Sequence, residues 1–353
     1  MAPKALVTGA SGLLGREVAK SFEYAHWEVV GTGLTRPNPP SIIKLDLLNG
    51  EDIKRVLDEE KSAQRILLVL PVQPLCSELR LNIGKIHNDF EHMNYQAYST
   101  IGAANRFPDS CTKDPDAARA INVVSTGTLA SEAYKRSIVL IYISTDYVFS
   151  GKPGEAPYTT SSPTGPPNVY GETKLEGEQA VLEATKGADK GVLGVILRVP
   201  VLYGRPEATD TAPSAVYAIV EAVRKAGRLK ESEASVKVDD YGIRFPTATE
   251  DVGRVCVDIA KLYSEQAKAG SGQNDLPRIL QFSSSDKYTK YDMAKVFADI
   301  VGLPTNKIAA WDPTKDEEEA KSTTVRPYNT QLDTSALKNL GISTSSLNFV
   351  AWW

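Results

Sequence analysis

Short apolar runs alternate with helix-periodic stretches through the first 200 residues of the chain. The apolar runs lie at residues 5–7, 42–45, 66–70, 138–143 and 192–197. The helix-periodic stretches between them lie at residues 51–62, 116–135 and 169–184. Continuous apolar strands separated by helices are typical of a parallel sheet that helices cover on both faces. The pattern therefore predicts an α/β fold with a doubly wound parallel sheet.

The pattern changes after about residue 200, where the segments at 213–226, 251–263 and 290–301 are helical. Thr289 and Asp292 are spaced as a capping box at the start of the last segment, and Gly302 with Pro304 marks its end. We expect these helices to form a smaller carboxy-terminal lobe.

The length of 353 residues favours one large α/β layer with an appended lobe over two equal domains. We assign residues 1–200 to a nucleotide-binding domain and residues 201–353 to a smaller substrate- or partner-binding lobe, with the two interleaved.

One block, residues 71–101, fits neither pattern. It has no clean period and holds His87 and His92, two of the three histidines. A long surface insertion and a translated intron are both open explanations. No further ligand cluster accompanies the two histidines, so a metal site is not predicted.

The composition narrows the classes of partner. The formal net charge of −4 provides no basic field for nucleic acid or an anionic membrane, and no apolar run is long enough to span a bilayer. The three cysteines show no paired metal spacing, and an odd number of thiols fits a reducing compartment. We expect a cytoplasmic protein whose oligomeric state is open.

A glycine-rich turn follows the first apolar run. Gly9, Gly12 and Gly15 lie between the run at 5–7 and an amphipathic helix, and a second strand follows at 27–31. Glycines at this spacing permit a sharp turn and a bare backbone that faces a pyrophosphate, and the helix N-terminus offers free N–H groups. The context predicts a dinucleotide site.

The residues after the second strand bear on which dinucleotide binds. The stretch 31–36 holds no carboxylate and ends in Arg36, whereas an NAD site needs an acidic residue for the ribose hydroxyls. NADP is therefore favoured. The alternative is that Arg36 is a solvated loop charge.

A second set of candidate residues follows the apolar run at 138–143. Thr145 comes just after the run, and Tyr170 and Lys174 are four apart on a predicted helix, so their side chains project from one face. A neighbouring ammonium would lower the pKa of the phenol. Tyr170 could then protonate a carbonyl oxygen that Thr145 orients, while Lys174 binds the nicotinamide ribose.

These motifs resemble those of the extended short-chain dehydrogenase/reductase superfamily, which has a Rossmann fold. The stretch 144–151, Ser-Thr-Asp-Tyr-Val-Phe-Ser-Gly, is similar to the branch that includes dTDP-4-dehydrorhamnose reductases. The resemblance implies catalytic roles for Thr145, Tyr170 and Lys174. It also implies dinucleotide contacts by Gly9, Ser11, Gly12, Leu13, Leu14, Gly15, Arg36, Asp46, Leu47, Ala103, Ala104, Tyr170, Lys174 and Arg198.

The stretches 198–204, 244–247, 289–294 and 326–333 resemble more closely the regulatory beta subunits of methionine adenosyltransferase. That family keeps the reductase fold and the NADP site, yet acts by binding the catalytic subunit that makes S-adenosylmethionine. The resemblance therefore implies a regulatory subunit, with an NADPH-dependent reductase of a nucleotide-sugar carbonyl as the alternative; whether the chain turns over a substrate is open. The chain stops at Trp353, before the tail that family members use near their partner, so we expect weakened partner binding.

Overall fold

The computed structural model describes residues 2–34, 36–38, 40–59, 107–187, 194–207, 210, 214–269, 276–316 and 324–353. For residues 65–69 and 268–269 it describes the backbone alone. The expectations for the block 71–101, with its two histidines, and for Ala103 and Ala104 lie outside these residues.

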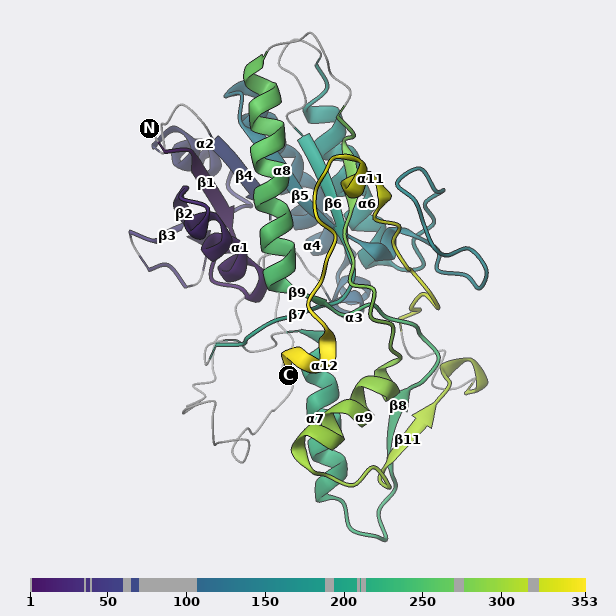
Figure 1. The fold of residues 1–353 in the computed structure, drawn as a ribbon. Coiled ribbons are helices and arrows are strands. Elements are labelled where there is room, and N and C mark those ends of the chain that lie inside the picture. The colour runs from purple at the N-terminus through teal and green to yellow at the C-terminus, as the bar shows by residue number, and fades with distance from the viewer. Residues whose placement is uncertain are drawn as a thin grey trace.

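A seven-stranded parallel sheet forms the larger layer of the molecule (Figure 1). Its strand order is β10-β6-β5-β4-β1-β2-β3, and every neighbouring pair is parallel. The strands are β1 (Lys4–Thr8), β2 (Glu28–Gly33), β3 (Ile42–Lys44), β4 (Arg65–Val69), β5 (Val139–Thr145), β6 (Gly194–Val199) and β10 (Ile279–Gln281). The predicted doubly wound parallel sheet is confirmed.

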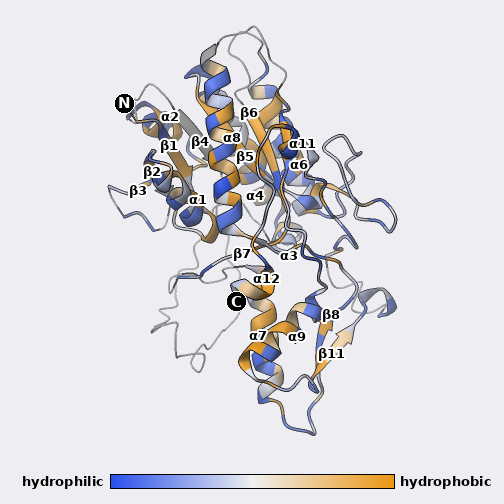
Figure 2. Cartoon of the chain, viewed as in Figure 1, coloured by the Kyte–Doolittle hydropathy of each residue, from blue (hydrophilic) through white to orange (hydrophobic). Residues whose placement is uncertain are grey.

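Helices cover both faces of this sheet, and β5 shows why its sequence is apolar throughout. Ile141 and Ile143 face one hydrophobic core, whereas Leu140 and Tyr142 face the other. The first core packs α1 (Leu13–Tyr24), α8 (Thr249–Ala269) and α11 (Ser335–Asn339) against the strands. The second packs α2 (Gly50–Glu59), α5 (Thr126–Lys135) and α6 (Val169–Ala184). Figure 2 shows the resulting apolar strands between helices that are polar on their outer sides.

The predicted helix at 116–135 contains a π-helical turn. It consists of α4 (Pro115–Arg119), the π turn η1 (Ala120–Ser125) and α5, and α3 (Pro108–Lys113) precedes it. The Asp114 side chain caps α4 by accepting from the Ala117 N–H at 3.0 Å. The π turn carries Asn122, whose Nδ2 donates to the Thr173 hydroxyl of α6 at 3.0 Å. A π turn often marks a functional position in a helix.

The smaller lobe lies below the sheet in Figure 1 and has its own core. It is built from α7 (Ala215–Arg228), α9 (Lys290–Val301), α12 (Phe349–Trp352) and the parallel pair β8 (Val236–Asp239) and β11 (Ile308–Trp311). The short pair β7 (Leu202–Tyr203) and β9 (Thr247–Ala248) joins it to the sheet. Short 3-10 helices also occur at η2 (Asp146–Val148), directly after β5, and at η3 (Pro313–Lys315), after β11. Aromatic rings fill the lobe core, with Phe349 fully buried between Tyr203 and Phe297.

The ends of α9 are as the sequence predicts. Thr289 and Asp292 form a complete capping box, and Gly302 ends the helix in the left-handed region at φ 65°. The predicted helix at 251–263, in contrast, is not part of the smaller lobe. As α8 it packs along α1 on the larger sheet, because Val252, Val255 and Ile259 are buried in the same core as Val18 and Phe22 of α1. Together with β10, it shows that chain beyond residue 200 completes the larger layer, while the boundary at 200 stays a prediction.

Among the described helices, none has the length and apolarity that a membrane span requires.

Candidate functional site

The glycine turn between β1 and α1 is as tight as its sequence predicts. Gly9 adopts φ 65°, and the Gly12 N–H donates to the Gly9 carbonyl at 2.9 Å. A Cβ on Gly15 would lie 2.1 Å from that same carbonyl oxygen, so α1 starts in direct contact with the turn. Leu13 and Leu14 are buried in the first turn of α1 and hold it against the sheet. Such a bare turn at a helix N-terminus fits a bound pyrophosphate.

The end of β2 lies beside this turn. A Cβ on Gly31 would lie 2.6 Å from the Ala10 Cβ, and one on Gly33 would lie 3.3 Å from the Ser11 Oγ. The residues after β2 are therefore next to the glycine turn, which is where the adenosine ribose of a dinucleotide lies in this type of fold.

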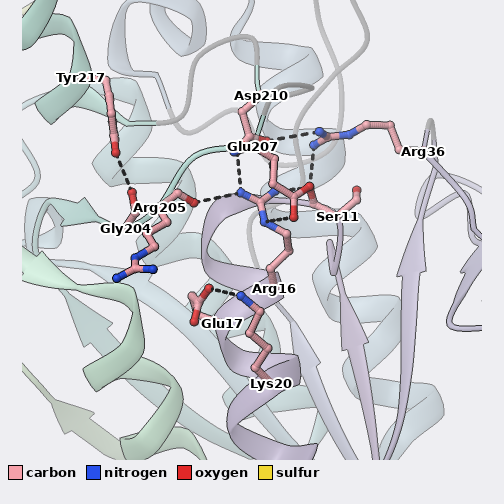
Figure 3. Close-up of polar contacts among 10 residues, drawn as sticks. All are labelled: Ser11, Arg16, Glu17, Lys20, Arg36, Gly204, Arg205, Glu207, Asp210 and Tyr217. Carbon is pink, nitrogen blue, oxygen red and sulfur yellow. Dashed lines mark hydrogen bonds and ion pairs between the residues drawn. The ribbon is translucent and has the colours of Figure 1, made fainter. Parts of the chain in front are cut away.

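Arg36 contacts the glycine turn directly (Figure 3). Its Nη2 donates to the Ser11 carbonyl at 2.7 Å, and its Nη1 lies 3.2 Å from Asp210 Oδ1. Arg16 of α1 donates to the same Ser11 carbonyl at 2.8 Å and pairs with Asp210 Oδ2 at 2.6 Å. The alternative interpretation of Arg36 as a solvated loop charge is wrong, because its guanidinium is held by two partners. We call Arg16, Arg36 and Asp210 the arginine cluster.

Asp46 and Leu47 follow β3 and stabilise their own loop. The Asp46 carboxylate accepts from the Leu48 N–H at 3.0 Å, and its N–H donates to Asp52 Oδ2 at 2.8 Å. Leu47 is buried in the core that contains α2. Both residues thus lie on the β3 to α2 connection, two strands from the glycine turn in the sheet order.

Thr145, Tyr170 and Lys174 are brought together at the carboxyl end of β5, and we call them the tyrosine–lysine cluster. Asn168 caps α6 by accepting from the Gly171 N–H at 3.0 Å. A Cβ on Gly171 would lie 2.2 Å from the Tyr147 carbonyl oxygen, so α6 begins in contact with η2. This contact places the ring of Tyr170 6.0 Å from that of Tyr147 and in hydrogen-bonding contact with Thr145.

The charges of the tyrosine–lysine cluster differ from the sequence-based expectation. Burial raises the pKa of Tyr170 above its ordinary value, against the hydrogen bond with Thr145, which lowers it. Burial also lowers the pKa of Lys174 to about 7, although the charge of Glu178 opposes this shift. The Lys174 ammonium donates to the Ile143 carbonyl at 2.8 Å and lies 3.9 Å from the centroid of the Tyr142 ring. The expected lowering of the phenol pKa by Lys174 is therefore wrong for this structure.

Asp146, which follows Thr145, is also buried. Burial raises its pKa to about 6, although a hydrogen bond from Thr330 and the charge of Arg244 act in the other direction. Thr145 Oγ1 donates to Asp146 Oδ1 at 3.1 Å. Asp146 therefore links the threonine of the cluster to a loop of the carboxy-terminal region.

Arg198 is buried among side chains of the sheet and of the helix that covers it. Its Nη2 lies 2.7 Å from Glu178 Oε2, and each of these side chains is no more than 3% exposed. The guanidinium also donates to Gln281 Oε1 at 3.4 Å and lies over the ring of Phe149. These contacts join β6, α6 and β10, so Arg198 supports the sheet beneath the tyrosine–lysine cluster.

Sequence reasoning missed several polar residues that the fold brings to this region. Asn122 lies in the π turn, and its Oδ1 has no hydrogen-bond partner among the described residues. Arg244 is buried and donates to the carbonyls of Ile243 and Pro327, with its Cζ 6.0 Å from the centroid of the Tyr147 ring. Asp210 is the third, and its 194-residue separation from Arg16 leaves no local signal. Only the position of Arg16, directly after the glycine motif, could have drawn attention to the arginine cluster.

Among the residues that the structure describes, no three histidine, cysteine, aspartate or glutamate side chains gather as metal ligands would.

Two family models match this chain. Residues 86–347 match the family described as RmlD substrate binding domain, and residues 5–71 match the NAD dependent epimerase/dehydratase family. The first match begins inside the block 71–101.

Two relatives share one name. The methionine adenosyltransferase 2 subunit beta of Rattus norvegicus is 34% identical over 340 residues, which cover 96% of this chain and 83% of that protein. The Danio rerio protein of that name is 34% identical over 348 residues, which cover 98% of this chain and 87% of that protein.

Among solved structures, the dTDP-4-dehydrorhamnose reductase of Bacillus anthracis in complex with NADP has a TM-score of 0.68 with this chain. The two are 20% identical, and the match covers 98% of this chain and 95% of that one. At this identity the likeness shows the fold.

The chain therefore belongs to the RmlD-type family of extended short-chain dehydrogenases/reductases, a family of NAD(P)-binding proteins, and its curated relatives include the methionine adenosyltransferase 2 beta subunits.

Proposed function

We propose that this chain is an NADP-binding regulatory subunit of a methionine adenosyltransferase and supports the synthesis of S-adenosylmethionine. The observation that carries the proposal is the similarity to methionine adenosyltransferase 2 beta subunits, which extends over nearly the whole chain at higher identity than the match to the reductase structure. The proposed partner is the catalytic subunit, and the proposed location is the cytoplasm. In this proposal, residues 1–200 bind the nucleotide and the smaller lobe meets the partner.

We infer that the nucleotide is NADP(H) rather than NAD(H). Arg36 lies against the glycine turn at the end of β2, and a second arginine, Arg16, donates to the same carbonyl. Arginine binds phosphate through paired N–H donors, so this arrangement supports binding of the 2′-phosphate. The glycine turn would hold the pyrophosphate, and Tyr170 and Lys174 would lie beside the nicotinamide ribose.

A second candidate function is an NADPH-dependent reductase of a nucleotide-sugar carbonyl. It is favoured by one observation, the contact of Tyr170 with Thr145 beside Lys174. In this function Tyr170 would donate its proton to the carbonyl oxygen that Thr145 orients. The lowered pKa of Lys174 argues against it, because a lysine that is only partly protonated near pH 7 gives less electrostatic help to the phenolate that remains.

Tyr170→Phe separates the two functions, since it removes the hydroxyl and keeps the ring. We would measure co-purification with the methionine adenosyltransferase catalytic subunit and NADPH oxidation with a dTDP-4-keto-6-deoxy sugar, using the original chain and the variant. A regulatory subunit should bind its partner equally well in both forms and show no sugar-dependent oxidation. Turnover by the original chain that falls by at least about 100-fold in Tyr170→Phe, with no partner bound, would overturn the proposal.

A further inference from the structure

The carboxylate of Asp210 lies where the arginine cluster would bind an external anion. Its two oxygens reach Arg16 Nη2 at 2.6 Å and Arg36 Nη1 at 3.2 Å, and its side chain has no exposed surface. Both arginines also donate to the Ser11 carbonyl of the glycine turn, so the three groups form one assembly at the end of β2 (Figure 3).

The charge of Asp210 is maintained in this setting. Burial raises its pKa, but hydrogen bonds and charges from Arg16 and Arg36, with the Glu207 N–H, hold the pKa below its ordinary value overall. Asp210 is therefore an anion at neutral pH. Asp210 is thus the one buried carboxylate among the described residues that pairs with both guanidinium groups.

Asp210 comes from the connection between β7 and α7, which leads from the sheet to the smaller lobe. This connection contacts α1 at other points, through the Arg205 carbonyl and through Glu207, whose carboxylate lies 3.2 Å from Arg16 Nε. Glu207 and Asp210 also bond to each other, because the Asp210 N–H donates to the Glu207 carbonyl at 2.9 Å and the Glu207 N–H to Asp210 Oδ2 at 3.0 Å.

We propose that Asp210 is a built-in counter-ion of Arg16 and Arg36, and that the 2′-phosphate of NADP displaces it. This inference rests on the proposed NADP site. A phosphate monoester carries about 1.5 to 2 negative charges and three acceptor oxygens, so it satisfies two arginines better than one carboxylate does. Arg36 keeps 26% of its side chain exposed and Arg16 10%, so the phosphate approaches the pair from the side of Arg36.

Displacement of Asp210 by the 2′-phosphate has two consequences. Affinity for NADP is lower than the arginines alone would provide, because the ligand must compete with a buried ion pair. Binding of NADP also separates Asp210 from Arg16 and Arg36, whereas NAD, which lacks the 2′-phosphate, leaves these ion pairs in place. The contacts of Asp210, which lies on the connection that enters the smaller lobe, therefore depend on which dinucleotide is bound.

The test compares Asp210→Asn with Glu207→Gln by calorimetric titration of NADP⁺ and NAD⁺. Asparagine keeps the size and the acceptor oxygen while removing the charge, so NADP⁺ should bind about tenfold more tightly. NAD⁺ affinity should change by less than about twofold. Glu207 also faces Arg16, but its side chain is 57% exposed, so Glu207→Gln should change neither affinity by more than about twofold.

Amide hydrogen exchange on the unaltered protein gives a second measurement that does not depend on a variant folding. NADP⁺ should accelerate exchange at the Glu207 and Asp210 amides, and NAD⁺ should not. Unchanged or weaker NADP⁺ binding by Asp210→Asn, or no acceleration with NADP⁺, would overturn the inference while leaving an NADP site intact. Weaker NAD⁺ binding by the variant would instead make Asp210 a ribose ligand. A chain that binds neither dinucleotide, or prefers NAD⁺, would overturn the proposed cofactor itself.

Discussion

The two polar clusters at the carboxyl edge of the sheet handle charge in opposite ways. The arginine cluster, beside β1 and β2, keeps full charges and pairs them, and Arg36 retains contact with solvent. The tyrosine–lysine cluster, at the end of β5, suppresses charge, because burial lowers the pKa of Lys174 to about 7 and raises that of Tyr170. The difference fits the two ends of a nicotinamide dinucleotide, one of which carries phosphates and the other an uncharged or singly charged ring.

The choice of cation explains much of this contrast. An arginine stays protonated in any protein environment, so it must be paired when it is covered, as Arg16 is by Asp210. A lysine can lose its proton when it is buried, and Lys174 is 2% exposed with a backbone carbonyl as its hydrogen-bond acceptor. A site that only binds a cofactor needs a cation that stays charged more than it needs a cation that can lose its proton.

The largest effect is expected at the buried ion pair of Glu178 and Arg198, which lies beneath the tyrosine–lysine cluster. Glu178→Gln should lower the free energy of unfolding by about 3–5 kcal/mol, because it leaves the buried Arg198 guanidinium without its counter-charge. Glu176→Gln is the matched control two residues earlier on α6. Its partner Arg119 is 43% exposed, so the loss should stay below about 1 kcal/mol. Chemical denaturation of both variants makes the comparison, and equal losses would show that burial of the Arg198 pair carries no special weight.

An intermediate effect is expected at the glycine turn beneath the arginine cluster. Gly15→Ala places a methyl group 2.1 Å from the Gly9 carbonyl oxygen, so it should cost about 1–3 kcal/mol of stability and weaken dinucleotide binding. Gly127→Ala in α5 is the control, because its added Cβ would lie 3.5 Å from the nearest atom, an ordinary contact. Thermal melts and titration with NADP⁺ measure both effects. A variant at residue 15 that binds NADP⁺ normally would contradict the role of the turn.

The smallest effect is a pH dependence that belongs to the tyrosine–lysine cluster alone. Lys174 has a folded pKa of about 7 against an ordinary value of 10.5, so between these pH values the unfolded chain binds a proton that the native protein lacks. Burial of the lysine therefore costs stability, and this cost falls as pH rises above 7, with a slope of at most about 1.4 kcal/mol per pH unit. Lys174→Met should remove this slope and be the more stable protein near pH 7. Urea denaturation from pH 7 to pH 9 measures it, and parallel curves for the two proteins would show that Lys174 stays charged.

Elements whose signals are local follow from the sequence with few errors. The glycine turn, the strands of the parallel sheet other than β10 and the capping box of α9 depend on residues within a few positions of each other, so pattern and turn chemistry suffice. The sequence also predicts the helix at 251–263, but it does not predict that this helix packs on the larger sheet. Its apolar face fits either lobe, and only the packing of Val252 and Ile259 against α1 decides between them.

The site divides in the same way. The sequence by itself determined the Gly9 to Gly15 turn, the Arg36 position and the Tyr170 and Lys174 spacing, because each is a relation between neighbours in the chain. Tertiary structure alone decided that Asp210 meets Arg16, that Glu178 neutralises Arg198, and that burial lowers the pKa of Lys174 to about 7. Those outcomes depend on partners brought from distant segments and on the water they exclude. Electrostatic energy depends on distance and burial in space, and neither can be read from positions along the chain.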